Sequence, residues 1–98
     1  MQVTLWVLVE MLTYEGAFVR SVNQRAMVDG AMVPVYYETE AACHESLLGY
    51  AKPDYEIYKS REVERLTVQY SLSPQHEAYM YCNPFFINEN AVEFLHVR

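Results

Sequence analysis

The side chains best able to do chemistry here are two cysteines and three histidines, the usual ligands of zinc and the usual partners in covalent catalysis. No pair of them has the Cys-x-x-Cys or His-x3-His spacing of structural zinc sites. The three glycines are isolated, so the chain has no glycine-rich phosphate loop. The sequence therefore predicts no metal site, no cofactor, no catalytic residue and no enzyme. The residues considered are Cys43, His44, His76, Cys82 and His96.

The cysteines leave two further interpretations open. Cys43 and Cys82 can meet and pair in space, but a disulfide persists only in an oxidising compartment. A Cys43–His76 nucleophilic pair would need a cleft and an oxyanion site that the sequence does not specify. The apolar run 3–12 lacks a basic flank and contains Glu10, which argues against an export signal, and it is short for a membrane helix. We expect two buried, reduced thiols in a cytoplasmic protein.

The charge balance limits the partners. Thirteen acidic residues against seven Lys and Arg give a net charge of −6 and a pI near 4.9. Domains that hold nucleic acid or anionic membrane carry basic patches, so we expect neither partner. An acidic surface attracts a basic protein. The same negative charge also keeps a small domain soluble. The net charge alone therefore does not show whether the acidic surface binds a partner or only provides solubility.

Nine tyrosines in 98 residues are the most unusual feature of the composition. Tyrosine is enriched in protein interfaces because it offers large, rigid contact area. Tyr36 and Tyr37 are adjacent on a predicted strand, so one points outward if the other points inward, whereas Tyr79 and Tyr81 share a face. The alternative is that tyrosines line the rim of a small core. We predict a partner-binding surface made of Tyr36, Tyr37, Glu38, Glu40, Glu45 and Glu56.

The elements that must position these side chains follow from periodicity and turn chemistry. The apolar run 3–12 predicts a central strand, and Gly16 and the Asp29-Gly30 pair predict two hairpins. Thr39 predicts the start of a helix that Gly49 and Pro53 close. Clean alternation over 66–72 predicts a half-buried strand, paired with 78–82. Mixed charges over 54–65 favour a second helix, and Asn83-Pro84 is expected to end the last hairpin.

The order of these elements predicts the fold class. We expect an α+β domain over residues 1–98, with a small antiparallel sheet of four to five strands and one or two helices packed on one face. Residues 85–98 are too hydrophobic for a free tail. They are expected to form a C-terminal edge strand or an interaction tail.

The pattern Tyr36-Tyr37-Glu38-Thr39-Glu40-Ala41-Ala42-Cys43, followed by a strand ending Tyr81-Cys82-Asn83-Pro84, resembles small acidic accessory proteins of phages and mobile elements. The resemblance covers about half of the chain. It implies a class that includes anti-CRISPR proteins, which act in the cytoplasm of the host cell. We therefore expect a non-enzymatic inhibitor that binds a basic surface of a host defence or nucleic-acid-handling complex. The alternative is a phage assembly protein or homo-oligomer that self-associates through the N-terminal strand edge or residues 85–97.

Overall fold

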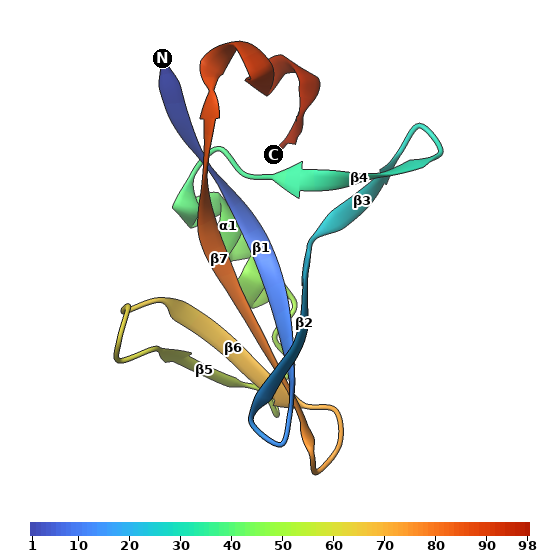
Figure 1. Cartoon of the computed structure of the whole chain (residues 1–98), viewed down its shortest axis with the longest axis vertical. Coiled ribbons are helices and arrows are strands. Elements are labelled where there is room, and N and C mark those ends of the chain that lie inside the picture. The colour runs from blue at the N-terminus through green and yellow to red at the C-terminus, as the bar shows by residue number, and fades with distance from the viewer.

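A computed structural model describes all 98 residues and confirms the α+β class. A five-stranded antiparallel sheet has the order β2-β1-β7-β6-β5, and a second sheet has the order β3-β4-β8 (Figure 1). One α-helix and one 3-10 helix complete the fold. The elements are β1 (Gln2–Tyr14), β2 (Ala17–Asn23), β3 (Arg25–Val28), β4 (Ala31–Tyr36), α1 (Glu40–Gly49), β5 (Glu56–Lys59), β6 (Leu66–Ser71), β7 (His76–Asn88), η1 (Glu89–Phe94) and β8 (His96–Val97).

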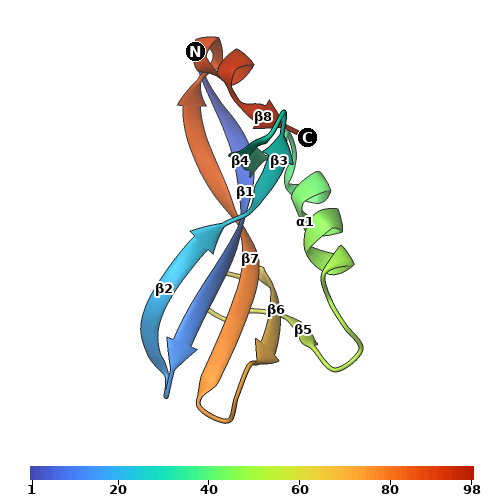
Figure 2. The same cartoon turned by 90° about the vertical axis from the view of Figure 1, so that its right-hand side faces the viewer.

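The long strands β1 and β7 form the axis of the molecule and separate its two faces. They pair over their whole lengths, from Gln2 opposite Asn88 to Tyr14 opposite His76. Because side chains alternate along a strand, their even-numbered residues point toward α1 and their odd-numbered residues point away. Figure 2 shows that α1 covers one side of the sheet only. The core cluster between α1 and this side consists of Leu8, Val35, Tyr37, Cys43, Leu47, Val68, Met80 and Cys82.

The helix begins where the sequence predicts. Thr39 is its N-cap, with Oγ1 accepting a hydrogen bond from the Ala42 N–H at 3.1 Å. Glu40 lies in the first turn, where a carboxylate stabilises the positive end of the helix dipole. Cys43 and Leu47 are four residues apart, and both are completely buried against the sheet. The Asp29-Gly30 hairpin is also confirmed, as the turn between β3 and β4.

Residues 54–65 do not form the second helix that the mixed charges favoured. Instead, β5 pairs with β6 as the outermost strand of the sheet, and a turn joins the two strands. Ser60 closes this turn, donating its N–H to the Arg65 carbonyl and accepting from the Arg65 N–H on Oγ. Charged side chains are as well solvated on an edge strand as on a helix, so the charges could not separate the two structures.

The last hairpin strand does not end at Asn83-Pro84 either. β7 continues through Pro84 to residue 88, although proline cannot donate to a ladder. Opposite Pro84, the Trp6 N–H donates to the Tyr37 carbonyl at 2.8 Å, and the Trp6 carbonyl accepts from the Tyr37 N–H at 2.7 Å. On the other side of β7, the pairing with β6 ends at Tyr81, before the proline. Since neither neighbour requires a hydrogen bond from Pro84, the strand tolerates it.

The C-terminal residues 85–98 are built into both sheets. Residues 85–88 extend β7, η1 turns the chain, and β8 lies parallel to β4, beginning opposite Val35 just after Pro34. The N-terminal strand β1 pairs with β7 along its whole length, and with β2 on its other side over residues 9–14. Neither helix has the length and apolar character needed to cross a membrane.

Candidate protein-binding face

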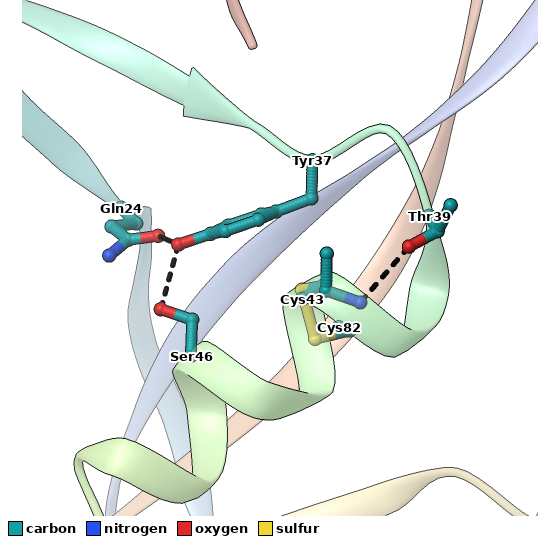
Figure 3. The surroundings of a disulfide bond; sticks show 7 residues. Gln24, Tyr37, Thr39, Cys43, Ser46 and Cys82 are labelled. Atoms are coloured by element: carbon teal, nitrogen blue, oxygen red, sulfur yellow. Dashed lines mark hydrogen bonds between the residues drawn. A yellow bond between two sulfur atoms is a disulfide. The ribbon is translucent and has the colours of Figure 1, made fainter. Parts of the chain in front are cut away.

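The two cysteines are joined by a disulfide, so the expectation of reduced thiols was wrong (Figure 3). Cys82 occupies an even-numbered position of β7 that faces α1, and Cys43 occupies the α1 position that faces the sheet. The bond ties helix to sheet inside the core, where the residues are 2% and 0% exposed. Bonded sulfurs can neither attack a substrate nor bind zinc.

Tyr37, predicted to contact a partner, lies in the core and is only 3% exposed. Its hydroxyl donates to Gln24 Oε1 at 2.5 Å and lies 2.7 Å from Ser46 Oγ (Figure 3). Tyr36 is half-buried, with its ring centroid 5.1 Å from that of Phe85. The sequence correctly indicated that the two tyrosines differ in direction. It was wrong to assign Tyr37 to the binding surface.

The structure does not gather the four predicted acidic residues into one surface. Glu38, Glu40 and Glu45 are exposed just before and along α1. Glu56 is exposed on β5, opposite Gln69, at a position that points away from α1. The one ion pair of the structure joins the N-terminal ammonium to Glu89, at 3.6 Å. The acidic side chains of the predicted set therefore have no cationic partner within the chain.

A different group of tyrosines lies on the sheet face that α1 leaves uncovered. Tyr58 of β5 lies opposite Thr67 of β6, and Thr67 lies opposite Tyr81 of β7. Tyr79 lies opposite Gln69, one row further along. Directly opposed residues share a face of a sheet. We use the name tyrosine face for Tyr58, Tyr79 and Tyr81 together with Arg65, Gln69 and Glu77.

A hydrogen-bond network holds the side chains of the tyrosine face in place across three strands. The Tyr58 hydroxyl donates to Gln69 Oε1 at 2.8 Å, and Gln69 Nε2 donates to Glu77 Oε2 at 3.3 Å. Ser71 Oγ donates to the second oxygen of the same carboxylate at 2.9 Å. Side chains ordered in this way lose less conformational entropy when a partner binds.

The electrostatics of this face suit a cation. Partial burial, followed by the proximity of Tyr79, Glu56 and Glu77, raises the pKa of Tyr58 above its usual value. The Arg65 guanidinium carbon lies 3.7 Å above the centre of the Tyr81 ring. This stack is a cation–π contact, in which the negative face of the ring attracts the positive charge. The face therefore combines aromatic rings and carboxylates that attract guanidinium groups.

Comparison of the chain with protein-family models, with curated proteins and with solved structures finds no match. Part of the tyrosine face was visible in the sequence, since Tyr79 and Tyr81 were predicted to share a face. Tyr58 was missed because residues 54–65 were expected to be helical.

Proposed function

We propose that the chain is a non-enzymatic protein-binding protein whose tyrosine face recognises an arginine-rich surface of another protein. The stack of Arg65 on Tyr81 is the observation that carries this proposal. It is an example, within the chain, of the contact that a partner's guanidinium would make with Tyr58 or Tyr79. Arginine suits such a site because its planar group stacks on rings and pairs with carboxylates at the same time.

The carboxylates of the site supply the second half of this recognition. Glu77 belongs to the tyrosine face, and Glu56 lies beside it, close enough to raise the pKa of Tyr58. A guanidinium stacked on a ring can donate hydrogen bonds to a neighbouring carboxylate. The net charge of −6 adds long-range attraction, which speeds encounter with a basic partner more than it tightens the complex.

A narrower form of the proposal follows from the resemblance to phage accessory proteins. Proteins hold nucleic-acid phosphates with arginine-rich and lysine-rich surfaces. A protein that covers such a surface competes with the nucleic acid and would act as an inhibitor of a host defence complex, as an anti-CRISPR protein does. Because the cytoplasm keeps thiols reduced, this form also requires that the chain fold without the Cys43–Cys82 bond.

The broader proposal is tested by titrating the protein into a fluorescent arginine-rich peptide and following anisotropy. Tyr79→Ala is expected to weaken binding about tenfold, the usual cost of removing an interface aromatic residue. The matched control is Tyr50→Ala, because Tyr50 is 51% exposed and lies outside the tyrosine face. The proposal fails if Tyr79→Ala binds like the wild type while exchanging Glu38, Glu40 and Glu45 for glutamine abolishes binding.

The narrower form is tested with a purified CRISPR effector complex and labelled target DNA. The wild-type protein is expected to reduce DNA binding by a susceptible effector, and Tyr79→Ala is expected to reduce it less. Unchanged DNA binding for every effector type would contradict the narrower form. The peptide titration would still decide the broader one.

A further inference from the structure

One edge of the five-stranded sheet is long, apolar and uncovered. β2 is the outermost strand there, all seven of its residues are exposed, and Arg20 is its one charged residue. Phe18, Val19 and Val22 are 64%, 50% and 50% exposed. The outer side of an edge strand presents unpaired N–H and carbonyl groups, which bind a further strand readily.

The opposite edge of the same sheet is protected. β5 has only four residues, and its ends carry Glu56 and Lys59, both exposed. Short length and charged side chains are the usual means by which proteins prevent edge-to-edge pairing. β2 is longer, with seven residues, and carries a single charge, Arg20, and no proline. Its register with β1 shifts once, between Leu12 and Thr13. The two edges therefore differ in their capacity to accept another strand.

The β3–β4 hairpin, which follows β2 in the chain, exposes further apolar side chains. It projects away from the main sheet on the side where β2 lies (Figure 1). Met27 and Met32 are paired across the hairpin and are 64% and 52% exposed. A hollow of about 480 Å³ separates β2 from the hairpin and is lined by residues of both, including Asn23 and Pro34. We call β2 and this hairpin the open edge.

The exposed area of the chain is large enough to account for an interface. Its accessible surface is 6768 Å², whereas a folded monomer of 11.5 kDa is expected to expose about 5,800 Å². The excess of about 1,000 Å² is close to the area of about 800 Å² that each partner buries in a standard protein interface. The chain thus exposes the surface of about one interface beyond that of a typical monomer.

We propose that a second copy of this chain covers the open edge, with the two β2 strands antiparallel about a two-fold axis. The charges at the two ends of β2 favour this occupant. Glu15 stands two residues before the strand and Arg25 two residues after it, and both are exposed and without ion-pair partners. Antiparallel pairing sets Glu15 of each copy beside Arg25 of the other, so opposite charges meet at both ends.

The test is sedimentation equilibrium of the full chain over a wide concentration range. The wild type is expected to be a dimer at about 100 µM. Val22→Lys is expected to raise the dissociation constant of the dimer about a hundredfold, because it places a second charged side chain on the strand that pairs with the other copy. The matched control is Ile57→Lys on the protected edge, where the side chain is 51% exposed. This control should leave the dimer intact, and circular dichroism checks that both variants fold.

A charge exchange tests the antiparallel arrangement itself. Glu15→Arg and Arg25→Glu are each expected to weaken the dimer about tenfold, since each sets like charges at two symmetric contacts, and the double variant is expected to restore it. The same register brings the two Arg20 side chains near the axis. Arg20→Ser is therefore expected to tighten the dimer.

Three results would overturn the proposal. They are a wild type that stays monomeric at about 500 µM, a dimer that Val22→Lys leaves unchanged, and a double charge variant that dimerises no better than the single ones. If Val22→Lys does not fold, hydrogen exchange of the wild type decides: the β2 amides must become more protected as concentration rises, and the β5 amides must not. The tyrosine face lies on β5, β6 and β7, away from the open edge, so the outcome is independent of the proposed protein partner.

Discussion

Reduction of the Cys43–Cys82 disulfide removes a constraint on the unfolded chain, and the structure sets the size of the effect. The two residues are 39 positions apart. Closing a loop of that length lowers the entropy of the unfolded chain by about 13 cal/mol/K, which corresponds to about 4 kcal/mol of stability at 25 °C. Small domains have a total stability of about 5–15 kcal/mol. The melting temperature is therefore expected to fall by about 15–30 °C on reduction.

The assay is urea unfolding of the oxidised and the reduced protein, followed by fluorescence of Trp6. This side chain is the only tryptophan, and it packs against the core. The control is the double variant Cys43→Ala with Cys82→Ala, whose unfolding should not respond to reductant. A difference of less than about 1 kcal/mol between oxidised and reduced wild type would refute the loop-closure reasoning. A reduced chain that is unfolded at physiological temperature would contradict the cytoplasmic inhibitor.

Three further perturbations test the elements that support the site. Tyr37→Phe removes a buried hydroxyl with two side-chain partners and is expected to cost about 1–3 kcal/mol in urea unfolding. Thr39→Ala removes the helix cap and is expected to cost about 1 kcal/mol in the same assay. Partial burial, then the hydrogen bond to Glu10, raises the pKa of Tyr70. Its neutral form thus adds stability that is complete below pH 10 and declines above it, so Tyr70→Phe should flatten the alkaline loss of stability in unfolding measured against pH.

Local signals in the sequence predicted the elements whose structure depends on neighbouring residues. The Asp29-Gly30 turn, the Thr39 cap and the alternation over 66–72 each have a short-range cause, and all three are present in the structure. Pro84 and residues 54–65 were predicted wrongly because their structure depends on strands far away in the sequence. Pro84 is tolerated because Trp6, the residue opposite it, forms its backbone hydrogen bonds with Tyr37 and not with Pro84.

The candidate site depended on the same long-range information. The disulfide could not be inferred from spacing, since α1 and β7 meet only after the sheet has formed. Tyr37 was assigned to the surface because alternation says that neighbours differ in direction but not which of them points inward. The tyrosine face required the register of three strands, which no local pattern encodes.

The most direct test of the proposed function is an NMR titration of isotope-labelled protein with the arginine-rich peptide. We expect the amide signals that shift to belong to β5, β6 and β7 around Tyr58, Gln69 and Tyr79. Shifts confined to α1 around Glu40 and Glu45, or spread evenly over all acidic residues, would contradict it.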